Sequence, residues 1–204
     1  MRNLVAMLLS AAILCGCGST PRWKNQTFAF SMPADPPQAN APTNIVALNR
    51  FSVSPLFQSR SFTYRTADNT YVQDPYAEFL VSPEHAVAEP IRAWMRNSGA
   101  LGRVVEAGST LTPTVGVEAS VNELCGDFRK TSQPVASMQI RFIIYQVNDG
   151  SPGRIMLDKV YACETPLARK TPAAVMAAWD ADLHEIMGEI ESDYAKAHSN
   201  DSGR

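Results

Sequence analysis

The first seventeen residues constrain the fold of this chain most. They are expected to lie outside the folded domain, and they determine the compartment in which the rest of the chain folds. Arg2 precedes an apolar run over residues 4–14 that only Ser10 interrupts. A charged start and a short hydrophobic core are typical of a secretory signal peptide, whereas a spanning helix needs roughly 20 apolar residues. We therefore expect residues 1–16 to be a cleaved signal peptide.

The sequence Leu14-Cys15-Gly16-Cys17 resembles a bacterial lipobox, in which small residues precede the cysteine that is acylated. Cleavage before Cys15 would place bulky Leu14 at the cut, so Cys17 is the expected lipidation site, with residues 17–22 as a tether. The alternative is an ordinary signal peptide cut at a small-residue site. Each CH₂ group of a palmitate or similar acyl chain that is buried in the bilayer contributes about 0.8 kcal/mol of binding free energy. Several acyl chains on Cys17 would therefore anchor the protein stably.

The mature chain of about 188 residues has the length and composition of one globular domain. The sequence is 45% hydrophobic and 19% charged, with a formal net charge of −2. This balance provides no basic face for nucleic acid. Residue 18 is glycine, at a position where aspartate commonly retains a lipoprotein in the inner membrane. Gly18 therefore favours the periplasmic side of the outer membrane.

Apolar alternation and turn signals predict strands at 23–33, 45–53, 61–65, 70–73, 114–128, 136–147 and 154–162. Asp68-Asn69 is expected to join the third and fourth strands in a hairpin, and residues 148–153 to join the last two. Residues 33–43 contain four prolines and are predicted to form an extended loop.

Two helices are predicted. Ser82 as a cap and Pro83 at the first helical position begin one that ends near Ser98, with a kink or a later start caused by Pro90. The other covers residues 172–197, and a disordered tail is expected at 198–204. Each carries an apolar stripe of the kind that packs on a sheet, although a partner-binding face is the alternative for the second.

This order of elements predicts the fold class. We expect an α+β fold in a single domain over residues 23–197, with a mostly antiparallel sheet and the two main helices packed on one face.

Cys125 and Cys163 are the cysteines that remain once Cys15 is removed and Cys17 is acylated. A pair in an oxidising compartment is usually a disulfide, so we expect one here, with two buried free thiols as the alternative. Closing a loop of about 38 residues would stabilise the fold by about 2–4 kcal/mol. Two thiols without a nearby histidine are too few ligands for a metal, and we expect no cofactor.

The sequence lacks the common catalytic motifs, namely the G-x-S-x-G elbow, the P-loop and the dinucleotide fingerprint. His184-Glu185 begins a metalloprotease-like pattern, but Gly188 stands where zinc would need a second histidine. Glu185, Glu189 and Asp193 share one helix face, which is more typical of a solvated edge than of a proton-transfer pair. We expect a binding protein and not an enzyme; a hydrolase would need convergent polar groups around one of the histidines.

Four segments in a fixed order carry a family resemblance. They are FAFSMP at 28–33, FSVSPLFQSRSFTYR at 51–65, YAEF at 76–79 and WDADL at 179–183. With the lipobox, they resemble the ABC-type transport auxiliary lipoproteins, the PqiC-like group. Phe28 and Phe30 stand where that family usually has tyrosines, and the pair of cysteines is not one of its features.

The resemblance implies a non-enzymatic periplasmic subunit of an ABC transporter that works with MCE-type substrate-binding proteins. Such systems move phospholipids or other hydrophobic molecules between the two membranes. The implied partners are the MCE-domain protein and the ABC permease and ATPase, and a homo-oligomer is possible because MCE-type partners form rings. Phe62, Tyr64 and Tyr71 of the hairpin 62–72 are the candidate docking residues; the alternative for the two tyrosines is that they pack on the sheet.

A second interpretation is a structural lipoprotein for envelope assembly, such as a secretin pilot or an outer-membrane biogenesis factor. Both interpretations expect an acylated Cys17 and no turnover, so the identity of the partner separates them.

Overall fold

The structure is a computed structural model that describes residues 25–31, 43–106 and 108–201. The predicted signal peptide, the tether with Cys17, and residues 33–42 of the proline-rich loop lie outside the described residues. None of the helices in the described part of the chain combines the length and the hydrophobicity needed to cross a membrane.

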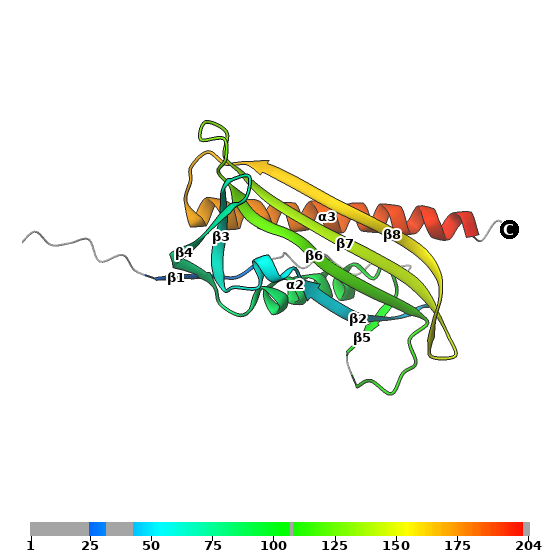
Figure 1. Ribbon diagram of the computed structural model, residues 1–204. Helices are drawn as coiled ribbons and strands as arrows, with labels where there is room; N and C mark the ends of the chain where they lie inside the picture. The colour runs from blue at the N-terminus through cyan, green and yellow to red at the C-terminus, as the bar shows by residue number, and fades with distance from the viewer. Residues whose placement is uncertain (1–24, 32–42, 107, 202–204) are drawn as a thin grey trace, which may run out of the picture.

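The described chain forms one eight-stranded sheet and two α-helices (Figure 1). The strands are β1 (Gln26–Phe28), β2 (Ile45–Val53), β3 (Ser61–Ala67), β4 (Thr70–Phe79), β5 (Arg103–Val105), β6 (Val115–Asp127), β7 (Val135–Asn148) and β8 (Ser151–Pro166). The helices are α2 (Pro83–Ser98) and α3 (Pro172–Asp201), and a short 3₁₀ helix, η1 (Pro55–Phe57), follows β2.

Strand β6 is the centre of the sheet. Its one edge pairs along its whole length with β7, which in turn pairs with β8, and both pairings are antiparallel. Its other edge is shared by two strands in succession. β2 runs parallel to the first half, from Val46 opposite Val115 to Val53 opposite Val121, and β3 takes over at Gly126. β5 extends the β2 branch, while β4 and then β1 extend the β3 branch.

The predicted fold class is confirmed as α+β, with helices on one face of a single sheet. The longest ladders, β6–β7 and β7–β8, are antiparallel, as is the β3–β4 hairpin. The shorter pairings of β2 and β3 with β6, of β5 with β2 and of β1 with β4 are parallel. α3 packs on β7 and β8, α2 packs on β2 and β5, and both helices contribute to the same hydrophobic core.

Helix α2 begins at Pro83 and contains Pro90 within it, so the alternative of a later start is wrong. Proline costs the helix a hydrogen bond, but the face that contains Val87 and Ile91 is fully buried and holds the helix in place. Ser82 precedes the helix as predicted, although its hydroxyl contacts His85 Nδ1 at 2.8 Å instead of capping the backbone. Gly99, at φ 61°, ends the helix in the left-handed conformation.

Helix α3 continues to Asp201, four residues beyond the predicted end at Ala197. Residues 198–201 are therefore helical and not part of a disordered tail; residues 202–204 lie outside the described residues. Thr171 caps the helix, because its Oγ1 accepts a hydrogen bond from the Ala174 N–H at 3.3 Å. The predicted apolar stripe is buried throughout: Val175, Trp179, Leu183, Ile186, Met187, Ile190 and Tyr194.

The predicted strand boundaries differ most for β1 and β8. Of the predicted strand 23–33, residues 23, 24, 32 and 33 lie outside the described residues, and within the described part β1 covers only three residues; β8 extends over sixteen, to Pro166. The β7–β8 hairpin forms at the predicted turn, where Asp149 (φ 50°) and Gly150 (φ 77°) both adopt positive φ. Two positive φ values in succession define the tight turn whose twist matches antiparallel strands.

Candidate docking surface

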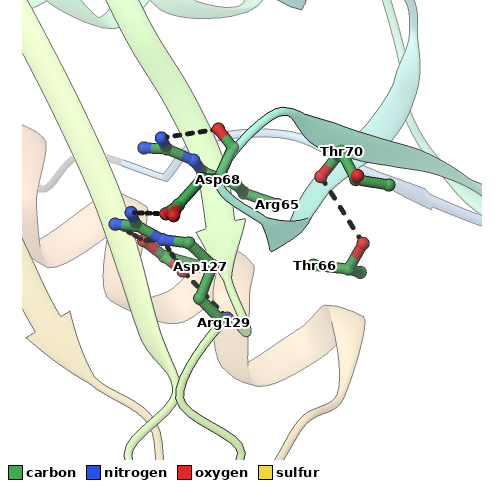
Figure 2. Close-up of polar contacts among 6 residues, drawn as sticks. All are labelled: Arg65, Thr66, Asp68, Thr70, Asp127 and Arg129. Carbon is green, nitrogen blue, oxygen red and sulfur yellow. Dashed lines mark hydrogen bonds and ion pairs between the residues drawn. The ribbon is translucent and has the colours of Figure 1, made fainter.

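Arg129, in the segment that follows β6, forms a hydrogen bond and an ion pair with the turn at the tip of the β3–β4 hairpin (Figure 2). Its Nη1 donates to Asp68 Oδ1 in the hairpin turn at 3.0 Å. Its Nε and Nη2 donate to Asp127 Oδ2 at 2.9 and 2.6 Å. On the other side of the turn, Arg65 Nη2 donates to the Asp68 carbonyl oxygen at 2.9 Å. Two guanidinium groups thus hold one exposed turn.

The ion pair between Arg129 and Asp127 favours the charged form of both side chains. The hydrogen bonds that Arg129 donates are the largest cause that lowers the pKa of Asp127, and the acceptance of these bonds by Asp127 and Asp68 raises the pKa of Arg129. A planar guanidinium that binds a carboxylate through two nitrogens is held in a fixed orientation. The carboxylate of Asp68 and its backbone carbonyl are therefore both held by arginine side chains at the exposed turn.

A surface pocket of about 490 Å³ opens beside this network. Its lining residues are Asp68, Asp127, Arg129, Lys130, Gln133, Val135 and Glu164. They come from the β3–β4 turn, the end of β6, the segment between β6 and β7, the start of β7 and the end of β8. We call this set the hairpin-tip surface. Its mixed charges, including the exposed Lys130, suit a polar protein surface better than an apolar ligand.

The three predicted docking residues have different positions. Phe62 is fully buried, in contact with Phe28 at 5.0 Å and Trp179 at 5.0 Å between ring centroids, so its assignment to a docking surface was wrong. The reason is the period of two along β3, which turns Phe62 towards α3.

Tyr64 stacks on Phe128 with ring centroids 4.8 Å apart and donates from its hydroxyl to Asp74 Oδ2 at 2.8 Å. Burial raises its pKa, and the Asp74 carboxylate raises it further. The alternative reading of Tyr64, that it packs on the sheet, is therefore confirmed. Tyr71 is 37% exposed and touches Phe57, with Arg65 5.7 Å from its ring centroid, so its outer part is accessible next to the hairpin tip.

The predicted disulfide is wrong: Cys125 and Cys163 are free. Cys125 lies opposite Ser137 of β7 and Cys163 lies opposite Met138, so β7 separates them. Neighbouring residues of a strand point to opposite faces, and two strand spacings amount to about 9–10 Å, beyond the reach of a disulfide. The alternative of two thiols holds, with Cys125 buried and Cys163 half-buried.

The groups considered for chemistry are dispersed. His85, His184 and His198 are all exposed, and the described residues contain no group of three or more potential ligands that could hold a metal. Asp193 accepts hydrogen bonds from Lys159 at 2.7 Å and Tyr161 at 3.2 Å, which ties the edge of α3 to β8. This is the solvated edge that the carboxylate spacing predicted.

Sequence reasoning missed the hairpin-tip network and the buried Asp182. Asp68 and Arg129 are separated by 61 residues, and no local pattern predicts their contact. Asp182, part of the WDADL segment at 179–183, is a carboxylate that is only 1% exposed. Its position within the apolar stripe, next to Leu183 and one turn from Trp179, was the available signal.

No protein-family model and no curated protein matches the sequence. Solved structures do match the fold. The crystal structure of protein XCC0632 from Xanthomonas campestris, of the family DUF330, has a TM-score of 0.73 and 15% sequence identity, covering 88% of this chain and 100% of that one. Another crystal structure, of an uncharacterized protein, has a TM-score of 0.60 and 10% identity, covering 78% and 98%. At these identities the matches show a common fold and assign no function.

Proposed function

We propose that this protein is a lipid-anchored periplasmic accessory subunit of an MCE-type ABC transport system that moves lipids or other hydrophobic molecules across the envelope. It acts by binding and bridging and carries no reaction of its own. Three things support the proposal: the lipobox that ends at Cys17, the order of the four segments that resemble the auxiliary lipoproteins, and a docking surface suited to a protein partner.

The observation that carries the binding role is the rigid hairpin tip. Asp68 is held from both sides by arginines, so its turn needs little ordering when a partner binds. The adjoining pocket places positive and negative groups at fixed points, which is how complementary charges select a partner and orient it. Tyr71, the one exposed member of the predicted docking set, adds an aromatic contact at the margin.

The test is affinity purification of the full-length, acylated protein from detergent-solubilised membranes, with identification of what binds. We expect an MCE-domain protein or an ABC permease in the eluate. A Lys130→Glu variant reverses an exposed charge of the pocket and should reduce recovery of that partner at least tenfold. Arg103→Glu is the matched control, because Arg103 is exposed on β5, outside the lining of the pocket.

Two results would count against the proposal. Recovery of secretion or outer-membrane assembly components, without transporter subunits, would favour the structural lipoprotein. Equal loss of the partner from both charge-reversal variants would remove the hairpin-tip surface as the docking site, because general charge would then explain the effect.

A further inference from the structure

Exposed apolar side chains are concentrated in one part of the described chain. Of the nine large hydrophobic residues that are exposed, five come from β4 and the loop that leads to α2: Tyr71, Val72, Tyr76, Leu80 and Val81. The last three form what we call the apolar corner. Their exposed fractions are 43% for Tyr76, 59% for Leu80 and 45% for Val81. Scattered single residues of this kind are ordinary on a protein surface, but a local group of them indicates a contact site.

The apolar corner is fixed to β1. The Leu80 N–H donates to the Phe28 carbonyl oxygen at 2.8 Å, and β1 pairs with β4 from Gln26 opposite Ala77 to Phe28 opposite Phe79. Just before this pairing, between Gln73 and Glu78, the register of β4 against β3 shifts, which marks a bulge that contains Asp74. The Asp74 Oδ1 atom accepts hydrogen bonds from the Tyr76 and Ala77 N–H groups at 2.8 and 3.0 Å, which stabilises the bulge that carries Tyr76.

Strand β1 is also where the tether reaches the domain. Gln26 is nine residues beyond Cys17, and an extended chain spans at most about 3.3–3.6 Å per residue, or roughly 30 Å in this case. A lipid anchor on Cys17 therefore keeps β1, and the corner attached to it, close to the bilayer surface. No other part of the sheet is bound to the anchor by so short a segment, since the chain must pass through β1 first.

We propose that the apolar corner contacts the bilayer that holds the acyl chains of Cys17, with Leu80 and Val81 in the interfacial region and Tyr76 at the headgroup level. Because the anchor already holds the domain at the surface, even a small apolar contact is populated at the high effective concentration of a tethered group. Tyrosine suits the boundary, since its ring is apolar and its hydroxyl is polar. The inference rests on the proposed acylation of Cys17 and adds an orientation of the domain to it.

The charges beside the corner indicate which lipid it would accept. Glu78 is paired with Arg60 at 3.0 Å, and Glu84 at the start of α2 is exposed. The exposed carboxylate of Glu84 would repel an anionic headgroup, and the guanidinium of Arg60 is already paired with Glu78, so the corner suits a zwitterionic surface such as phosphatidylethanolamine and phosphatidylcholine.

The experiment places a fluorescent label on the corner of the full-length, acylated protein in zwitterionic vesicles. Val81→Cys is labelled with an environment-sensitive dye in a Cys163→Ser background, where Cys125 stays buried. The matched control is Val160→Cys, because Val160 has the same exposed fraction of 45% and lies on β8, the opposite edge of the sheet. We expect at least a twofold rise in emission, and quenching by lipids that carry a spin label near the headgroup, at position 81 but not at 160.

Four outcomes overturn the proposal. Equal quenching at both positions would mean that the domain has no preferred orientation. A label at 81 that is unquenched while the protein floats with the vesicles would leave the anchor in place and remove the corner contact, and quenching that appears only when a protein partner is added would assign the corner to that partner. Failure to float, with Cys17 unmodified by mass spectrometry, would overturn both this inference and the anchored function.

Discussion

At the scale of single residues, Asp182 is the most unusual group in the core. It lies between α3 and β8 and accepts a hydrogen bond from the Thr165 hydroxyl, while its Oδ2 atom has no hydrogen-bond partner among the described residues. Burial is the largest cause that raises its pKa to about 6, and the nearby Glu185 carboxylate raises it further. The backbone carbonyl oxygen of Asp182 is 3.9 Å from the Cys163 thiol of β8.

Asp182→Asn is predicted to stabilise the protein at neutral pH. In the unfolded chain the pKa is about 3.9, so the folded state holds a proton that the unfolded state loses between about pH 4 and pH 6. The contribution of Asp182 is therefore fully present below about pH 4 and lost as the pH rises through about 6. Asparagine keeps the acceptor for Thr165, and we expect a gain of about 1–3 kcal/mol at pH 8 that vanishes near pH 4, measured by urea unfolding.

Asp158 is a matched control, because its pKa is shifted in the opposite direction from that of Asp182. The bonds from Arg141 lower the pKa of Asp158, so its contribution is present above about pH 4 and lost as the pH falls. Asp158→Asn should therefore reduce stability at pH 8 and have no effect at low pH. A pH-independent gain for Asp182→Asn would contradict the assignment of a raised pKa.

Phe62 and Tyr71 provide a second prediction, because they belong to one hairpin but to different environments. Phe62 is the hub of an aromatic cluster with Phe79 at 4.8 Å and Trp179 at 5.0 Å. Phe62→Ala should cost about 3–5 kcal/mol of unfolding free energy, whereas Tyr71→Ala should cost about 1 kcal/mol or less, by denaturant titration. Similar losses for the two variants would mean that Tyr71 also belongs to the core.

At the scale of elements, two glycines with open space around them should respond to the same substitution in opposite ways. Gly150 has φ +77° in the β7–β8 turn, and Gly188 lies on the exposed side of α3; a methyl group at either would meet nothing within 4 Å. Gly150→Ala should destabilise by about 1–2 kcal/mol because the left-handed conformation is strained. Gly188→Ala should stabilise by about 0.5–1 kcal/mol because alanine favours the helix. Thermal unfolding of both variants measures this, and two changes of the same sign would contradict it.

The elements could largely be predicted from the sequence, because each depends on local signals. β2 matches its prediction to the residue, since Pro55 ends the alternation that begins at Ile45. The apolar stripe of α3 was predicted correctly because a period of 3.6 is visible in the sequence. β1 was overestimated because its partner, β4, is paired with it over only three residues. A strand's length is set by its neighbour as much as by its own residues.

At the scale of the whole molecule, the site was harder to predict than the fold, because it is made by contacts between distant segments. The succession of β2 and β3 along one edge of β6 brings the hairpin turn to the end of β6, where Asp68 meets Arg129. A search for exposed aromatics in the hairpin found Tyr71 but also selected Phe62, since nothing local indicates which face of β3 the helices cover. The predicted disulfide was wrong for the same reason: the order of strands in the sheet cannot be seen in the sequence. The spacing of Cys125 and Cys163 does not show that β7 lies between them.

No disulfide holds the domain together, because Cys125 and Cys163 are both free. Its stability comes from the single core in which α2 and α3 cover the same face of the sheet. Polar contacts between distant segments add to it, such as the hydrogen bond at 3.1 Å from Asn44 Nδ2 to the Tyr194 hydroxyl. A reducing agent should therefore change the melting temperature of the mature protein by no more than about 1 °C, whereas loss of a native disulfide typically costs about 2–5 kcal/mol of unfolding free energy.

Cys163 should alkylate slowly at pH 8, because burial and the surrounding carboxylates raise its pKa to about 11. Cys125 should react only on unfolding, since it is fully buried. Thiol titration of the unreduced protein in guanidinium should find both cysteines; finding neither, together with a lower melting temperature on reduction, would mean that the strands rearrange around a cross-link that this fold does not allow.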